Sequence, residues 1–222
     1  MMNQVYSVAI DGPAGAGKST IARQAAEQMG FVYVDTGAIY RTLGYAVLSG
    51  GMDPADAAAV EKLLPSVCVS MDWIDGVQHM YLSDADVTDH IREPAVSQAA
   101  SKVAAVPAVR QFLLDMQRDV ARKRSVVMDG RDIGTVVLPD AAVKIYLFAS
   151  VEVRAKRRWL ELKDVPYEQV LRDVAERDKR DMNREIAPLR AADDAIMLDT
   201  SELNLQQSID AVLEIIRKKI AL

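Results

Sequence analysis

The sequence predicts an α/β fold built on a five-stranded parallel sheet, with a small inserted antiparallel sheet. Two observations predict it. Short apolar runs alternate with segments of helical periodicity, and one stretch between the second and third runs changes to an alternating pattern broken by turn residues. Continuous apolar runs between helices are typical of parallel strands buried on both faces. The order of strands and helices is that of a doubly wound, three-layer fold.

Five apolar runs are the candidate strands of the parallel sheet. They cover residues 5–10, 31–34, 125–128, 144–148 and 195–198. The first helix is expected over residues 18–29, since Gly30 follows as a C-terminal cap. Asp53-Pro54 is expected to open another helix, as N-cap and first-turn proline. Pro107 separates two amphipathic stretches around residues 94–123, and residues 205–220 show helical spacing of apolar side chains.

The inserted sheet is predicted from a hairpin pattern. Residues 67–73 and 77–82 alternate in polarity, and Asp75-Gly76 lies between them. An Asp-Gly pair between two such runs is a strong signal for a tight hairpin turn. Cys68, the only cysteine, lies at the start of this region in an apolar stretch, which favours a buried and inert thiol.

Composition excludes several classes of protein. The formal net charge of the 222 residues is −5, and duplex nucleic acid binders need a basic face, so no nucleic acid partner is expected. No basic-then-apolar leader opens the chain, and no apolar run approaches the ~18 residues that span a bilayer. We therefore expect a cytoplasmic protein without a membrane partner. The sequence shows no coiled-coil heptads, which favours a monomer.

A phosphate-binding loop follows the first predicted strand. Residues 12–19 match the pattern G-x-x-x-x-G-K-S and run directly into a helix at Thr20. Its members are Gly12, Pro13, Ala14, Gly15, Ala16, Gly17, Lys18 and Ser19. Backbone N–H groups of such a loop form an anion cradle, the lysine reaches the β and γ phosphates, and the serine can ligate magnesium. The sequence thus predicts a nucleoside triphosphate and Mg²⁺. The Asn-Lys-x-Asp and Asp-x-x-Gly patterns of switch GTPases do not occur.

Polar residues after the next two strands predict an acceptor site. Thr36, Tyr40 and Arg41 follow the second strand, at the edge of the sheet where open α/β folds bind ligands. Asp129 ends the third strand and is placed to act on magnesium directly or through water, while Arg131 and Asp132 are expected to face the acceptor. The alternatives are a helix cap with a solvated arginine in the first case, and a turn with solvated charges in the second.

Two arginine-rich segments come later in the chain. Arg177, Asp181 and Arg184 stand at i, i+4 and i+7, so we expect them to share one helical face. A salt-bridged, solvated helix would give the same spacing. Arg154, Arg157 and Arg158 fit a mobile lid that closes over the triphosphate, although ion pairing of this cluster with Glu161 explains it equally well. The domain organisation predicted is one P-loop kinase domain over residues 1–222, with an inserted β subdomain at 64–90 and lid and acceptor helices at 150–190.

At these motifs the chain resembles the bacterial-type cytidylate kinases, a branch of the nucleoside monophosphate kinases. The resemblance rests on GPAGAGKST, DTGAIYR, the segment 99–110, DGRDIGTVVLPDA and ERDKRDMNREIAPL, in that order. It implies transfer of the γ-phosphoryl group of ATP to CMP or dCMP. It further implies monophosphate ligands at Thr36, Tyr40, Arg41, Arg131 and Arg184, base recognition by Ser101, Arg110 and Asp132, sugar contacts from Arg177 and Asp181, and a lid role for Arg154, Arg157 and Arg158.

Elementary chemistry agrees with that reaction. A phosphate acceptor is already anionic at pH 7, so no general base is needed, and catalysis consists of alignment and neutralisation of charge. On this view Lys18, Arg131, Arg184, Asp129, Arg154 and Arg158 form the catalytic set, and Arg157 joins the loop in binding ATP. Two alternatives stay open: another nucleoside monophosphate or small-molecule kinase, and a nucleotide-binding regulatory module without turnover.

Overall fold

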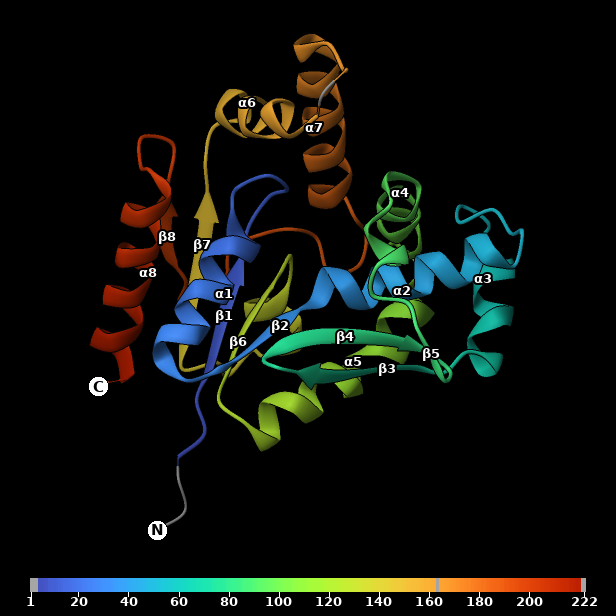
Figure 1. The fold of residues 1–222 in the computed structure, drawn as a ribbon, viewed down its shortest axis with the longest axis horizontal. Helices are drawn as coiled ribbons and strands as arrows, with labels where there is room; N and C mark the ends of the chain where they lie inside the picture. The colour runs from blue at the N-terminus through green and yellow to red at the C-terminus, as the bar shows by residue number, and fades with distance from the viewer. Residues whose placement is uncertain (1–3, 163, 221–222) are drawn as a thin grey trace. The chain divides into compact units, whose positions relative to one another are not determined.

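A computed structural model describes residues 4–162 and 164–220 (Figure 1). The chain forms two compact units. Unit 1 comprises the chain up to Tyr33 and from Lys123 onward, and unit 2 comprises Val34–Arg122. The predicted division into one kinase domain, an inserted subdomain of residues 64–90 and lid and acceptor helices of residues 150–190 stays a prediction.

The main sheet has five strands in the order β2-β6-β1-β7-β8. Their bounds are β1 Ser7–Asp11, β2 Val32–Asp35, β6 Val126–Gly130, β7 Val143–Phe148 and β8 Ile196–Asp199. The central strand β1 pairs in parallel with β6 and β7, placing Ile10 opposite both Asp129 and Ile145. Each strand begins within two residues of its predicted start, and the predicted α/β fold with five parallel strands is confirmed. Burial on both faces explains why these runs are continuously apolar.

Two helices of unit 1 cover one face of this sheet. They are α1 (Lys18–Met29) and α8 (Leu205–Ile220), and Figure 1 shows them side by side, α1 in blue and α8 in red. Their apolar stripes join the strands in one buried cluster that includes Ile21, Val212 and Leu147. Gly30 ends α1 in the left-handed conformation at φ 67°, as predicted from its position.

The remaining helices of unit 1 follow the carboxyl ends of strands. A π-helix, η3 (Ile133–Val137), comes shortly after β6, and α6 (Val151–Glu161) follows β7. The next helix, α7 (Tyr167–Met182), packs against α6. Since β1, β6 and β7 are parallel, the segments that follow them meet at one edge of the sheet, and this edge carries the polar residues of the candidate site.

Unit 2 is built around a close helix pair and the small antiparallel sheet. Its helices are α2 (Thr36–Ser49), α3 (Ala57–Leu63), η1 (Leu64–Ser66), η2 (His90–Arg92), α4 (Pro94–Val103) and α5 (Pro107–Lys123), which ends at the unit boundary. Helices α2 and α4 approach so closely at Gly44 that an added Cβ would lie 2.8 Å from the backbone nitrogen of Ala100. Glycine is therefore required there for the packing.

The predicted hairpin is present in unit 2. Strands β3 (Val69–Ile74), β4 (Val77–Leu82) and β5 (Ala85–Asp86) form an antiparallel sheet in that order. The turn residues Asp75 and Gly76 have φ of 51° and 78°, and two positive φ angles are what a tight two-residue hairpin turn requires. The Asp-Gly signal is thus confirmed together with its physical reason.

Two local predictions are wrong. The helix expected to open at Asp53-Pro54 begins later, at Ala57, because Asp56 accepts a hydrogen bond from the Ala59 N–H and is its cap, while Asp53 accepts from Ala55 in a local turn. Cys68 is exposed rather than buried, because it lies just before β3, where residues alternate between more and less exposed positions. Within residues 4–162 and 164–220, every helix is too short or too polar to cross a membrane.

Candidate active site

The phosphate-binding loop connects β1 to α1 in unit 1. Its conformation depends on three glycines with positive φ, Gly12, Gly15 and Gly17. Gly12 has φ 150° and lies so close to β7 that an added Cβ would stand 1.9 Å from the carbonyl oxygen of Leu147. Gly17, at φ 87°, is the residue before α1 and carries no side chain to cap that helix. The start of α1 therefore presents backbone N–H groups and the positive end of the helix dipole, which favours an anion.

Lys18 is the cation of this loop and is 5% exposed. Its Nζ donates a hydrogen bond to the carbonyl oxygen of Pro13 at 2.8 Å. Burial, and next the nearby positive charge of Arg131, lower the pKa of Lys18 to about 7, although Asp129 and Asp11 oppose the shift. A phosphate at this position would restore the charge of the ammonium group, since an opposite charge favours the ionised form.

Ser19 and Asp129 meet at the edge of the sheet. The Ser19 hydroxyl donates to Oδ2 of Asp129 at 2.9 Å, and the Tyr33 hydroxyl donates to Oδ1 at 2.9 Å. A hydroxyl and a carboxylate are oxygen ligands of the kind that Mg²⁺ prefers, and this ion usually takes one or two protein ligands beside substrate phosphates. The donor set therefore fits magnesium. Among the described residues no group of three or more His, Cys, Asp and Glu side chains could hold a metal by itself.

An arginine cluster surrounds Asp181, which is 1% exposed. Its Oδ2 accepts from Nε of Arg131 at 2.8 Å, and its Oδ1 accepts from Nη2 of Arg184. Burial would raise the pKa of Asp181, but the charges of Arg131 and Arg184 outweigh it and lower the pKa. Burial lowers the pKa of Arg177 to about 10, and among the described residues its buried Nε has no hydrogen-bond partner. Such a donor is suited to a ligand.

The expectation that Arg177, Asp181 and Arg184 share one helical face is wrong for Arg184. Helix α7 ends at Met182, so Arg184 lies beyond its C-terminus and reaches Asp181 from there. The spacing i, i+3 is typical of an ion pair within a helix, but here the chain has already left the helix. The cluster nevertheless holds all three predicted residues together.

The three arginines of the predicted lid have different environments. Arg154 is buried, pairs with Asp178 through two hydrogen bonds of 3.1 and 2.7 Å, and donates to the carbonyl oxygen of Ala14 in the phosphate-binding loop. Arg157 donates to the carbonyl oxygen of Thr200 at 2.7 Å. Arg158 is exposed and pairs with Glu161 at 2.8 Å, as the ion-pairing alternative expected. Their part in a lid stays a prediction.

In unit 2, the predicted residues after β2 lie in the first turns of α2. Thr36 is buried, and Asp35 before it caps the helix by accepting from the Ala38 N–H at 2.9 Å. Asp35 also pairs with Arg41 at 2.8 Å and so orients that guanidinium. Asp35 therefore fixes both the start of α2 and the position of the Arg41 side chain.

The predicted base-reading residues are divided between the units. Ser101 lies in α4 and Arg110 in α5, both of unit 2, while Asp132 lies in unit 1, buried, directly before η3. Arg110 is 8% exposed, donates to the carbonyl oxygen of Ala104 at 3.1 Å and stacks its guanidinium 5.5 Å from the ring centre of Tyr40. This cation–π contact links two predicted substrate residues.

Three residues of the site were missed from the sequence. They are Asp11, which binds the start of η3; Asp178, the partner of Arg154; and Tyr33, which binds Asp129. Asp11 carried a signal, a charged residue at the end of an apolar strand directly before a glycine loop. Asp178 and Tyr33 carried none, because their partners lie 24 and 96 residues away.

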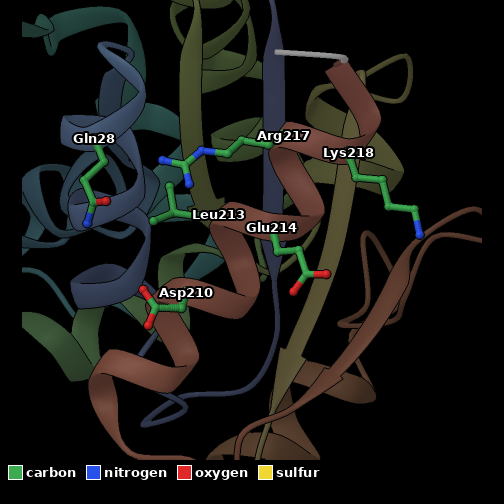
Figure 2. Close-up of a pocket in the computed structure, with 6 residues that line it drawn as sticks. All are labelled: Gln28, Asp210, Leu213, Glu214, Arg217 and Lys218. Carbon is green, nitrogen blue, oxygen red and sulfur yellow. The ribbon is translucent and has the colours of Figure 1, made fainter.

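A shallow surface pocket lies elsewhere in unit 1. It is formed by α1 and α8, has a volume of about 550 Å³ and is shown in Figure 2. Its lining residues are Gln28, Asp210, Leu213, Glu214, Arg217 and Lys218. These side chains come from the middle and the carboxyl ends of the two helices, whereas the phosphate-binding loop precedes the start of α1. The pocket therefore plays no part in the site described above.

The chain matches known proteins over nearly its full length. The family described as cytidylate kinase matches residues 8–218. A cytidylate kinase of Caldicellulosiruptor bescii is 47% identical over 216 residues, covering 96% of this chain and 96% of that protein. One of Bacillus velezensis is 46% identical over 222 residues, covering 98% and 99%. A solved structure of an uncharacterized protein from Eubacterium ventriosum has a TM-score of 0.57 at 15% identity, covering 97% and 99%, and supports the fold alone.

Proposed function

This chain belongs to the cytidylate kinase family, and from that premise we propose how its residues transfer the γ-phosphoryl group of ATP to CMP or dCMP. One observation carries the proposal. Arg131 lowers the pKa of Lys18 by charge repulsion, so the cation of the phosphate-binding loop and the arginine cluster lie within one electrostatic environment. A phosphoryl group that passes from donor to acceptor needs positive charge on both sides of its path.

The donor side is assigned to the phosphate-binding loop. Backbone N–H groups of residues 12–20 bind the phosphates of ATP, Lys18 neutralises charge on the β and γ groups, and Arg157 contributes to ATP binding from α6. Ser19 and Asp129 would hold Mg²⁺, which supplies charge neutralisation and alignment of the phosphates when bound. Arg154 and Arg158 are assigned to closure over the triphosphate, and the contact of Arg154 with Ala14 supports such a link to the loop.

The acceptor side is assigned by residue to both units. The monophosphate is bound by Thr36, Tyr40, Arg41, Arg131 and Arg184, and the sugar by Arg177 and Asp181. The orphaned Nε of Arg177 supports a ligand contact there. Ser101, Arg110 and Asp132 read the base: cytosine offers an amino donor beside two acceptors, whereas uracil would leave a buried acceptor unmatched. No proton has to be removed from the acceptor phosphate, so no residue is assigned as a general base.

Further parts of the proposal rest on charge and composition. We propose a monomer that acts in the cytoplasm, without a nucleic acid or membrane partner. The net charge of −5 supports the absence of these two partners, since phosphate backbones and anionic lipid surfaces attract basic faces. Size-exclusion chromatography with light scattering would test the monomer, and a mass of twice 24.4 kDa would contradict it.

The test of function is an acceptor panel. ADP release from Mg·ATP is measured with CMP, dCMP, UMP, AMP, GMP, shikimate or no acceptor. Turnover mainly with CMP and dCMP is expected. Turnover with another acceptor would keep the kinase and remove the cytosine assignment, and ATP binding without acceptor-stimulated turnover would favour a regulatory module.

The acceptor assignment is tested with Arg131→Ala. We expect kcat/KM for CMP to fall by about 10²-fold or more, because the variant removes a charged donor to the acceptor phosphate, while the Kd of ATP changes far less. Arg217→Ala is the matched control, since Arg217 lies exposed in the last turn of α8. Unchanged activity of Arg131→Ala with CMP would contradict the acceptor site.

A further inference from the structure

Asp11 ends β1 and directly precedes the first glycine of the phosphate-binding loop. Its carboxylate is buried and points to the start of η3 rather than to the loop. Oδ1 accepts a hydrogen bond from the Ile133 N–H at 2.8 Å, and Oδ2 accepts from the Gly134 N–H at 2.7 Å. These two N–H groups follow Asp132 directly, so one side chain connects the donor strand to the segment that carries predicted acceptor residues.

Hydrogen bonds fix both ends of η3, the π-helix that follows Asp132. The carbonyl oxygen of Asp132 accepts from the N–H groups of Val136 and Val137 at 2.9 and 3.1 Å. The N–H groups at the other end are the ones that Asp11 satisfies. A π-helix is rare and often occurs at functional sites, and its first N–H groups have no partner within the helix. Without Asp11, two buried donors would lose their acceptor.

The space around this contact is close-packed. A Cβ added to Gly134 would lie 3.4 Å from Oδ2 of Asp11 and 3.2 Å from Cδ of Lys144. The closer of these two contacts is with the lysine stem, and the distance to the carboxylate is that of an ordinary van der Waals contact. The start of η3 is therefore packed between the end of β1 and the side chain of Lys144.

A role for Asp11 as a proton acceptor does not fit these contacts. Burial raises the pKa of Asp11 to about 6, a range suited to a base, although the two backbone hydrogen bonds oppose the shift. Both carboxylate oxygens already accept N–H groups, however, and a phosphate acceptor has no proton to give up at neutral pH. A raised pKa also means that ionisation of Asp11 lowers the free energy of unfolding. A gain in stability therefore does not explain why a carboxylate occupies this position.

We propose that Asp11 is a positioning residue, which holds Arg131 and Asp132 in register with the phosphate-binding loop by binding the two N–H groups that follow them. The inference rests on the proposed function, since it assigns these two residues to the acceptor. Asp11 touches neither nucleotide. It makes the end of the donor strand and the acceptor segment one rigid piece, and a displacement of about 1 Å in such alignment is enough to slow transfer about 10²-fold.

Asp11→Asn tests the proposal. The variant keeps the shape, but its amide offers only one acceptor and turns an N–H₂ donor toward a backbone N–H. We expect KM for CMP to rise about tenfold or more and kcat to fall, because the acceptor segment shifts. The Kd of ATP, measured by calorimetry, should stay within about twofold, and the variant should remain folded with a lower Tm, because one buried N–H loses its acceptor. Asp119→Asn is the matched control, since it removes an exposed carboxylate paired with Arg122 in α5 and should change none of these values.

The outcomes separate the possible failures. An equal loss of ATP and CMP binding, or no loss of either, would overturn the positioning role. Asp11→Glu keeps the carboxylate but moves it by one methylene group away from its two donors, and it should raise KM for CMP while sparing ATP; it decides the matter if Asp11→Asn does not fold. If the acceptor panel identifies a different acceptor, the proposed function fails, and the same variants measured with that acceptor still test Asp11.

Discussion

The phosphate-binding loop and the arginine cluster lie in the same unit but gather positive charge in opposite ways. The loop uses consecutive residues, backbone N–H groups and one buried lysine. The cluster uses three arginine side chains, two of which bind a single carboxylate, Asp181, one of them from 50 residues earlier in the chain. A backbone cradle depends on glycine and, in this loop, on one lysine, whereas a side-chain cluster depends on its buried counter-ion. Each region should therefore fail by a different route.

The largest effect on chemistry is expected from Lys18→Met. The loop has only this side-chain charge directed at the β and γ phosphates, so we expect kcat to fall by about 10³-fold. Steady-state ADP release at saturating CMP measures it, and Lys218→Met, an exposed lysine of α8, is the control. If Lys18→Met lowered activity with CMP less than Arg131→Ala does, the arginine cluster would neutralise more of the phosphate charge than the loop.

The same variant should alter stability in a defined pH window. Lys18 has a pKa of about 7 in the folded protein against 10.5 for an ordinary lysine. Between these two values the folded state binds fewer protons than the unfolded state, so this group makes stability rise with pH. Lys18→Met should lose that rise and be the more stable protein at pH 7, as measured by urea unfolding at pH 7 and 9.

The cluster should instead fail through folding. Asp181→Asn leaves the guanidinium groups of Arg131 and Arg184 without their shared counter-charge, and we expect a loss of about 3 kcal/mol in the free energy of unfolding. Because the pKa of Asp181 is lowered, its stabilisation is present above 3.8, the pKa of an ordinary aspartate, and is lost as pH falls below that value. Urea unfolding at pH 7 and pH 3 measures this loss, and the difference between variant and wild type should shrink at pH 3.

An exposed pair is the control for that measurement. Asp119→Asn breaks a surface contact with Arg122 and should change stability by less than about 1 kcal/mol. If Asp181→Asn were equally mild, the arginines would not depend on their counter-ion, and the contrast between the two regions would disappear.

The two regions also differ in how far the sequence could predict them. The loop is local, so eight consecutive residues were enough to predict the cradle and the start of α1 at Lys18, and the apolar run before them predicted β1 to within two residues of its start. The cluster came from a helical spacing that holds for Arg177 and Asp181 but not for Arg184, since α7 ends at Met182 with Asn183 as its C-terminal cap. Helix ends depend on tertiary contacts as well as on local signals, and long-range partners such as that of Asp11 leave no trace in a periodicity.

The smallest effect is expected from a change at Tyr33, which orients Asp129 beside the phosphate-binding loop. Tyr33→Phe removes the hydroxyl that binds Oδ1 of Asp129, while Ser19 still binds Oδ2. Loss of such an orienting hydrogen bond typically weakens a metal site 10- to 100-fold, so we expect the Mg²⁺ concentration for half-maximal activity to rise by about tenfold. Calorimetry of ATP binding with and without Mg²⁺ gives a second readout that does not depend on turnover.

Tyr45→Phe is the matched control for this prediction. It removes a hydroxyl from a tyrosine that stacks on His90 in unit 2, and it should leave the Mg²⁺ dependence unchanged. If Tyr33→Phe and wild type have the same Mg²⁺ dependence, the strand and the hydroxyl of Ser19 orient Asp129 without Tyr33. The loop region would then need no side chain from outside its own residues, in contrast to Arg131 and Arg184, which depend on Asp181.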